Sequence, residues 1–78
     1  MKDEIRKFII ETFMYGEGEI KEDDALFESG ILDSLGLIKL LTFIENTYNV
    51  TIDMKEVTME KFATINHISD MIKLKQNT

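Results

Sequence analysis

The sequence predicts an all-α domain: a bundle of three longer helices and one short helix, with a long loop between the first two. Three segments repeat apolar residues at the three- and four-residue spacing of an amphipathic helix. Residues 50–52 alternate like a strand, but the chain offers no second strand to pair with them. The length of 78 residues predicts one domain, residues 1–78, with a thin core.

The first helix is expected over about residues 3–14. Its apolar positions follow the helical spacing and are Ile5, Phe8, Ile9 and Phe13. Gly16 and Gly18 are expected to break this helix and to begin a loop over residues 16–33. A structureless loop of this length is uncommon in a compact domain and is usually functional.

The second half of this loop is expected to return to the protein. Residues 25–27, Ala-Leu-Phe, are apolar and should reach the core, whereas the stretch before them is acidic. Gly30 is expected to supply a turn that brings Asp33 and Ser34 to the surface.

The second helix is expected over about residues 34–48 and should be the central element of the bundle. One apolar face is expected to contain Leu37, Ile38, Leu41, Ile44 and Tyr48. Leu35, Leu40 and Phe43 widen that face. The polar run at residues 46–49 then allows the helix to end.

The next segment is expected to be an extended connector followed by a short helix. Val50 and Ile52 should be buried in the connector. Thr58 is a suitable N-cap for a short helix over about residues 59–62.

Thr64 is expected to cap a last helix over about residues 65–74. Its inward residues are predicted to be Ile65, Ile68, Met71 and Ile72. Residues 73–78 are expected to be a frayed tail. His67, in the first turn, is expected at the surface.

Composition excludes several classes of site. The chain has no cysteine and one histidine, so disulfides, thiolate metal sites and a histidine cluster are excluded. Its net charge of −6 disfavours nucleic acid and anionic membranes. The acidic residues of the long loop lack the spacing of an EF-hand, so no metal site is expected. With no apolar run of about 20 residues and no signal-peptide pattern, a cytoplasmic monomer is expected.

Ser34 is the most informative residue, because its hydroxyl is placed at the start of an apolar helix. Serine is a preferred N-cap, so a purely structural role is one interpretation. Asp33 is itself a capable cap, however, and Gly36 should leave open space beside the hydroxyl. A helix N-terminus also favours an anion such as a phosphate ester. No histidine or cysteine is placed to make Ser34 a catalytic nucleophile.

The segment Leu26-Phe27-Glu28-Ser29-Gly30-Ile31-Leu32-Asp33-Ser34-Leu35-Gly36 resembles the prosthetic-group attachment site of acyl and aminoacyl carrier proteins. The resemblance extends over nearly the whole chain and implies their four-helix fold. It implies that Ser34 carries 4′-phosphopantetheine, whose thiol holds an acyl or aminoacyl group as a thioester. Asp33, Leu35 and Gly36 would flank the attached group, with Asp33 helping the modifying enzyme to position the site.

The resemblance also implies three partners. A phosphopantetheinyl transferase would install the arm from coenzyme A with magnesium, a ligase or synthase would load an acyl or aminoacyl group, and an acceptor enzyme would receive it. The carrier itself would be non-catalytic. Candidate contacts with a partner or the cargo are Ile31, Leu32, Lys39, Met54, Val57, Met59 and Phe62.

Lys39 departs from the carriers of fatty-acid synthesis, which have acidic residues along this helix. The wording Leu-Asp-Ser-Leu-Gly is closer to D-alanyl carriers and to free-standing carriers of specialised pathways. The alternative function is a non-covalent helical interaction module in which Ser34 is only an N-cap.

Overall fold

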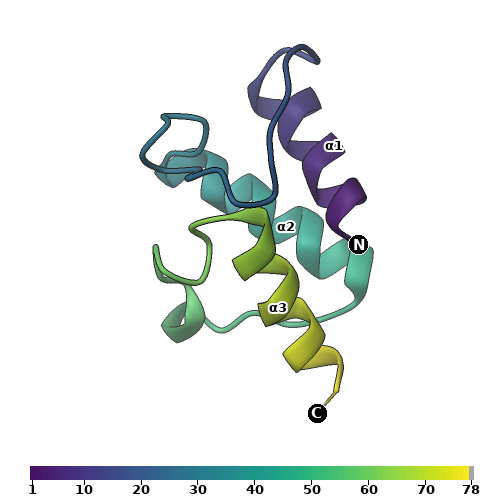
Figure 1. Cartoon of the computed structure of the whole chain (residues 1–78). Coiled ribbons are helices and arrows are strands. Elements are labelled where there is room, and N and C mark those ends of the chain that lie inside the picture. The colour runs from purple at the N-terminus through teal and green to yellow at the C-terminus, as the bar shows by residue number, and fades with distance from the viewer. Residues whose placement is uncertain (78) are drawn as a thin grey trace.

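The computed structural model describes residues 1–77 and shows three α-helices with long connections between them (Figure 1). Helix α1 spans Lys2–Phe13, α2 spans Ser34–Tyr48 and α3 spans Ile65–Gln76, and a 3₁₀ turn, η1, spans Met54–Glu56. No strand occurs within the described residues. The all-α class is therefore confirmed, but the predicted count of four helices is wrong.

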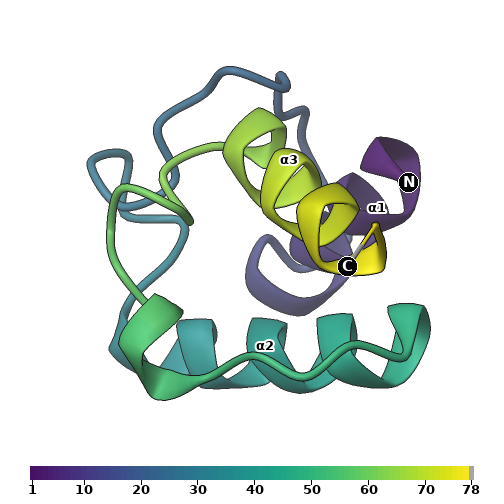
Figure 2. The same ribbon diagram turned by 90° about the horizontal axis from the view of Figure 1, so that it is seen from below.

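The three helices form two layers. Figure 2 shows α2 running beneath the other two helices, which lie next to each other and are in contact. Helix α1 begins beside the end of α2 (Figure 1). Its last residue, Phe13, is near Gly36 in the first turn of α2. The two helices are therefore antiparallel, and α1 extends back to the start of α2.

The core lies between these layers. Its buried hydrophobic residues are Ile5, Ile9, Ile20, Leu26, Leu32, Leu40, Ile44, Phe62, Ile65, Ile68, Met71 and Ile72. The four residues predicted to face inward on α3 are all among them, as is Leu26 from the apolar half of the loop.

Two residues of α2 that were predicted to belong to its apolar face, Leu35 and Ile38, are exposed. Gly36, Leu40 and Ile44 are buried and recur every four residues, which defines the inward face of α2. Ile38 is 61% exposed, although it was predicted to be buried. It follows Gly36 by two positions, about 200° around the helix, and the other helices cover α2 from one side.

The long loop is held against the bundle by backbone hydrogen bonds. The N–H of Leu26 donates to the carbonyl of Ala63 at 2.9 Å, and the N–H of Asn66 donates to the carbonyl of Glu22 at 3.0 Å. Arg6 Nε donates to the carbonyl of Ile20 at 3.1 Å. Gly30 has φ +82°, a left-handed conformation that glycine adopts without strain, so the predicted turn is confirmed.

The predicted short helix at residues 59–62 is absent. Thr58 does cap a turn there, because its Oγ1 accepts the N–H of Lys61 at 3.2 Å. The backbone there makes a short turn, in which the N–H of Phe62 donates to the carbonyl of Thr58 and the N–H of Ala63 donates to that of Glu60, both at 3.3 Å. The 3₁₀ turn lies earlier, at Met54–Glu56, where Asp53 accepts the N–H of Lys55.

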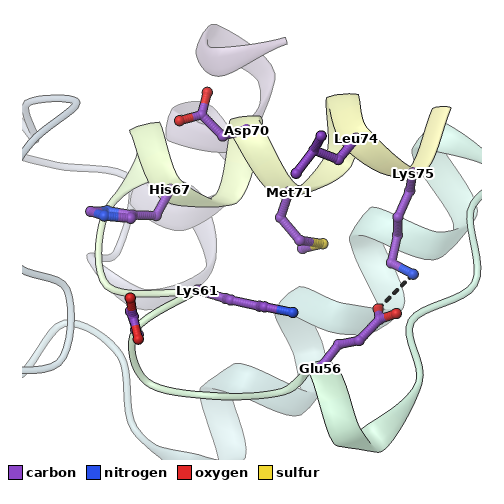
Figure 3. Close-up of a pocket in the computed structure, with 8 residues that line it drawn as sticks. Glu56, Lys61, His67, Asp70, Met71, Leu74 and Lys75 are labelled. Atoms are coloured by element: carbon purple, nitrogen blue, oxygen red, sulfur yellow. Dashed lines mark ion pairs between the residues drawn. The ribbon is translucent and has the colours of Figure 1, made fainter. Parts of the chain in front are cut away.

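The connector and the chain end also differ from prediction. Val50 and Ile52 are only partly buried. Helix α3 continues through residues 73–76, which were expected to fray, and Thr78 lies outside the described residues. Lys75 pairs with Glu56 at 2.5 Å and so ties the last turn of α3 to η1 (Figure 3). The predicted Thr64 cap is confirmed, since its side chain accepts the N–H of His67 at 3.1 Å.

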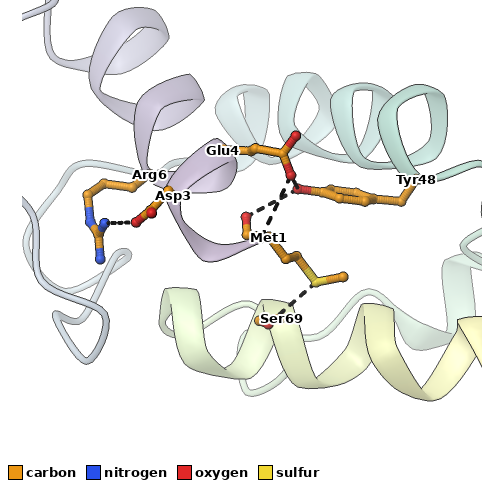
Figure 4. Close-up of polar contacts among 6 residues, drawn as sticks. All are labelled: Met1, Asp3, Glu4, Arg6, Tyr48 and Ser69. Atoms are coloured by element: carbon orange, nitrogen blue, oxygen red, sulfur yellow. Dashed lines mark hydrogen bonds and ion pairs between the residues drawn. The ribbon is translucent and has the colours of Figure 1, made fainter.

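A polar contact joins the beginning of α1 to the end of α2. The Tyr48 hydroxyl lies 2.9 Å from Glu4 Oε1 and 3.2 Å from the carbonyl of Met1 (Figure 4). Burial, together with the hydrogen bond and negative charge of Glu4, raises the pKa of Tyr48 well above its ordinary value. Beneath it, the buried Ser69 hydroxyl donates to Met1 Sδ at 3.4 Å.

Candidate functional site

Asp33, and not Ser34, caps helix α2. The side chain of Asp33 accepts the N–H of Gly36 at 2.7 Å, and its carbonyl accepts the N–H of Leu37 at 2.8 Å. Asp33 has the extended backbone of an N-cap, and Ser34 is the first helical residue. The cap interaction that serine could make is therefore supplied by its neighbour.

The Ser34 hydroxyl is the serine hydroxyl most available to an outside molecule. The chain has three serines. Ser29 Oγ donates to the carbonyl of Leu26 at 3.2 Å, and Ser69 is fully buried. Ser34 is exposed, and within residues 1–77 its hydroxyl makes no hydrogen bond. Its position leaves it accessible to a modifying enzyme.

The start of α2 also offers backbone donors. The N–H groups of Ser34 and Leu35 belong to the first turn, where no preceding residue of the helix can accept them. The positive end of the helix dipole lies in the same place. Both favour a phosphate group attached to Ser34, whereas the Asp33 carboxylate adds a negative charge that opposes it.

Gly36 has a different role from the one predicted. It is buried and does not leave open space beside the hydroxyl. A Cβ at this position would lie 3.0 Å from Cε1 of Phe13, 3.2 Å from Oδ1 of Asp33 and 3.2 Å from Cδ1 of Leu32. A larger residue would be crowded here because the first turn of α2 is in close contact with the end of α1. Sequence reasoning missed Phe13 as part of this site, and its place at the end of the first apolar face was the available signal.

The apolar residues around Ser34 are divided between the core and the surface. Leu32 is 2% exposed and Ile31 is partly buried. Leu35 is 74% exposed, and Ile38, one helical turn beyond Ser34, is 61% exposed. The exposed apolar surface beside the hydroxyl therefore consists of Leu35 and Ile38, and sequence reasoning did not identify Ile38.

Lys39 lies on the same exposed side of α2. It lines a groove of about 480 Å³ between α1 and α2, together with Ile38, Phe8 and Thr42. Among residues 1–77, no acidic side chain lines this groove. The one acidic residue of α2, Glu45, is partly buried and accepts the N–H of Ile52 at 2.9 Å. The exposed residues of α2 are therefore two apolar residues, Leu35 and Ile38, one lysine and four neutral polar residues, in a chain of net charge −6.

The remaining predicted contact residues are in three different environments. Met54 and Met59 are 77% and 66% exposed, Val57 is partly buried, and Phe62 belongs to the core. Met59 also lines a hollow of about 250 Å³ with Phe27 and Ala63. Phe62 could contact a cargo only if the core opened, whereas the two methionines are accessible.

A second groove, of about 430 Å³, lies between η1 and α3 (Figure 3). Its lining contains both acidic and basic side chains, including Glu56, Lys61, His67 and Asp70, together with the apolar Met71. His67 is exposed as predicted, and its Nδ1 lies 2.7 Å from Thr64 Oγ1.

Across residues 1–77, no three His, Cys, Asp or Glu side chains gather as a metal-binding group. None of the helices in this part of the chain is long and apolar enough to cross a membrane.

Comparison with known proteins gives a consistent result. A family model described as a phosphopantetheine attachment site matches residues 3–72. The chain is 37% identical over 65 residues to a D-alanyl carrier protein from Streptococcus uberis, and the alignment covers 83% of this chain and 81% of the relative. It is 33% identical over 72 residues to a D-alanyl carrier protein from Streptococcus mutans, covering 92% and 90%. A D-alanyl carrier protein from Streptococcus suis is 35% identical over 68 residues, covering 87% and 85%.

Proposed function

The chain belongs to the phosphopantetheine-attachment family, and from that premise we propose that it is a carrier protein whose prosthetic arm is attached to Ser34. The thiol at the end of the arm holds an acyl or aminoacyl group as a thioester, and the carrier presents this group to partner enzymes. The observation that carries the proposal is the hydroxyl of Ser34 at the start of α2, which is exposed and makes no hydrogen bond within residues 1–77.

The residues at the start of α2 fit the prosthetic group of the family, 4′-phosphopantetheine, which is covalently attached. The group needs an accessible alcohol oxygen, and Ser34 supplies one. Its phosphate needs donors nearby, and the first-turn N–H groups of Ser34 and Leu35 supply them. The group gives the carrier a thiol, which this cysteine-free chain lacks.

Attachment is a phosphoryl-group transfer from coenzyme A to Ser34. A bond forms between Ser34 Oγ and the phosphorus that bears the pantetheine, and the bond from this phosphorus to the bridging oxygen of the pyrophosphate breaks. The leaving group is adenosine 3′,5′-bisphosphate, and the hydroxyl proton passes to a base of the transferase. The chain itself presents the hydroxyl and supplies no base. Since coenzyme A is required, we place the modification in the cytoplasm.

D-alanine is the cargo that we propose. The support is that the relatives named above are D-alanyl carrier proteins and that alignment with them spans most of both chains. Free D-alanine and a thiol do not form a thioester spontaneously, so a ligase that activates the carboxyl group must load it. An acceptor enzyme then takes the D-alanyl group.

Partner enzymes are expected to contact the exposed side of α2. Leu35 and Ile38 provide apolar area beside Ser34, and Lys39 provides a positive charge. A partner that fits this face has apolar side chains and a carboxylate near its active-site entrance. Met54 and Met59 extend the accessible apolar surface on the connector.

Intact-mass measurement tests attachment directly. The protein is incubated with coenzyme A, Mg²⁺ and a broad-specificity phosphopantetheinyl transferase, and the mass of one phosphopantetheine should be added. Ser34→Ala should remain unmodified, whereas Ser29→Ala, a matched change in the loop before α2, should be modified at the normal rate. An unmodified wild-type protein, or a modified Ser34→Ala, would show that the proposed attachment site is wrong.

The cargo is tested in a second step. The modified protein is incubated with D-alanine, ATP and the enzyme that loads the S. mutans D-alanyl carrier protein. We expect a further mass increase of one alanyl group that hydroxylamine removes, as it does from thioesters. Modification by the transferase without any loading would retain the carrier assignment and reject D-alanine.

A further inference from the structure

The first turn of α2 packs closely against the end of α1 and against the residues that directly precede α2. The ring of Phe13, from the end of α1, lies close to Gly36, as do the Leu32 side chain and the Asp33 carboxylate. All three would be 3.0–3.2 Å from a Cβ at residue 36, which is tighter than ordinary van der Waals contact. The position of this turn is therefore set by packing as well as by helix hydrogen bonds.

Two residues compete to cap α2, and propensity does not decide between them. Aspartate and serine are about equally good N-caps. In the observed register, Asp33 caps the helix and leaves the Ser34 hydroxyl without a partner. If the helix began one residue later, Ser34 would become the cap. Its oxygen would then accept a backbone N–H such as that of Leu37 and would be directed back toward the helix.

In the observed register, the first turn of α2 lies against the end of α1. Helix ends fray readily, and Asp33 is the acceptor for both ordered N–H groups at the start of α2. Its side chain accepts the N–H of Gly36, and its carbonyl accepts that of Leu37. The Phe13 ring lies so close to Gly36 that a Cβ at residue 36 would be 3.0 Å from its Cε1. The contact therefore favours the arrangement in which Gly36 donates to Asp33.

Phe13 is itself firmly placed. It is the last residue of α1, and the chain leaves the helix through Tyr15 and Gly16 in left-handed conformations. Its ring meets that of Phe8 edge to face, with centroids 5.9 Å apart. Phe8 in turn stacks on Phe43 of α2 at 4.2 Å. The aromatic row thus links Phe13 to both helices.

We propose that Phe13 is a positioning residue for the modification of Ser34. Its ring packs against Gly36 and holds α2 in the register capped by Asp33, so that the Ser34 hydroxyl stays free for the transferase. Phe13 does not touch the hydroxyl or the arm and acts through the first turn of α2. This inference rests on the proposed attachment to Ser34.

The test compares Phe13→Ala with a matched truncation on the same helix. Ile5→Ala is the control, because Ile5 is fully buried and lies eight residues away from Phe13. With coenzyme A and the broad-specificity transferase, we expect kcat/KM for modification to fall about 10-fold in Phe13→Ala, as misplaced reacting groups do. Ile5→Ala should retain the wild-type rate to within about two-fold despite its loss of stability.

Hydrogen exchange gives a readout that does not require the transferase. The amide of Gly36 donates to Asp33 in the observed register and loses this acceptor if Ser34 becomes the cap and accepts the N–H of Leu37 instead. Its exchange in the unmodified protein should therefore speed up in Phe13→Ala relative to the amide of Leu40, deeper in α2. In Ile5→Ala, the ratio of the exchange rates of the Gly36 and Leu40 amides should be the same as in the wild-type protein.

A double mutant separates positioning from a general loss of stability. In an Asp33→Ala background the cap is already absent, so Phe13→Ala should lower kcat/KM by no more than about a further two-fold. If Phe13→Ala fails to fold, Phe13→Leu, which keeps most of the volume, should show the same effects at smaller size.

The outcomes distinguish this inference from the proposed function. A wild-type protein that is never modified overturns the attachment site. In that case, hydrogen exchange of the Gly36 amide by itself decides whether Phe13 holds the register of α2. A wild-type protein that is modified normally, with Phe13 variants modified and exchanging as the Ile5 control does, overturns the positioning role.

Discussion

Replacing Gly36 by alanine sets two effects against each other. Alanine is the better helix former, and in an exposed helix this substitution stabilises by about 0.5–1 kcal/mol. Here the added methyl group would meet the Phe13 ring at 3.0 Å and both Asp33 Oδ1 and Leu32 Cδ1 at 3.2 Å. The sign of the change depends on whether these neighbours can move.

None of the three neighbours can move freely. Leu32 is 2% exposed, and the Phe13 ring is held by Phe8. A shift of the Asp33 carboxylate would lengthen its 2.7 Å hydrogen bond with the N–H of Gly36. Overpacking costs about 1–3 kcal/mol, and a lost N-cap costs about 0.5–2 kcal/mol. Taken against the gain in propensity, Gly36→Ala should destabilise the protein by about 1–2 kcal/mol.

Thermal unfolding followed by far-UV circular dichroism measures this change. For a domain of this size, about 1–2 kcal/mol corresponds to a fall in Tm of about 4–16 °C. The matched control is Gly36→Ala in a Phe13→Leu background, where the nearest contact is relieved and the fall should be much smaller. A rise in Tm on Gly36→Ala alone would refute the close packing between the end of α1 and the start of α2.

Three other changes have definite expected results. Ser34→Ala should alter the free energy of unfolding by less than about 0.5 kcal/mol, because Asp33 supplies the cap; a loss of 1 kcal/mol or more would mean that serine is the cap. Lys39→Glu should raise KM for loading of the modified protein by the S. mutans enzyme, with the exposed Lys7→Glu as control; equal effects of both would exclude a specific contact. The raised pKa of Tyr48 keeps its phenol neutral in the folded protein while the unfolded chain ionises above about pH 10, so stability falls as pH rises beyond that value. In Tyr48→Phe, the fall of Tm with rising pH between about pH 9 and pH 11 should be less steep than in the wild-type protein. An unchanged dependence of Tm on pH would contradict this.

The sequence predicted the elements whose signals are local. Helix α2 was predicted at its observed limits, because its apolar run is preceded by Asp33 and is followed by Asn49, which takes a left-handed conformation. The Thr64 cap of α3 was equally local. The attachment motif was recognised from contiguous residues, and the family model covers it.

The sequence could not predict features that depend on which segments meet. Ile38 fits the periodicity of α2, but it is exposed because the other helices cover one side of that helix. The expected helix at 59–62 is a turn in the structure, although Phe62 is buried in the core. The role of Gly36 depends on Phe13, which is 23 positions earlier in the chain and adjoins it only after folding.

The site places two negative charges at one helix end once Ser34 is modified. A phosphodiester at a helix N-terminus is favoured by about 0.3–1 kcal/mol, but the Asp33 carboxylate already occupies that end and repels it. The two effects oppose each other, so the modified and unmodified proteins should differ little in Tm. Asp33→Asn keeps an oxygen that can cap Gly36 while removing the charge. In this variant, modification should raise Tm by a few degrees at low salt, and added salt should diminish the rise, because salt screens the attraction between the phosphate and the helix end. If modification shifted the Tm of the wild-type protein by as much as it shifts that of Asp33→Asn, the Asp33 charge would not oppose the phosphate, and its contribution to this site would be the cap alone.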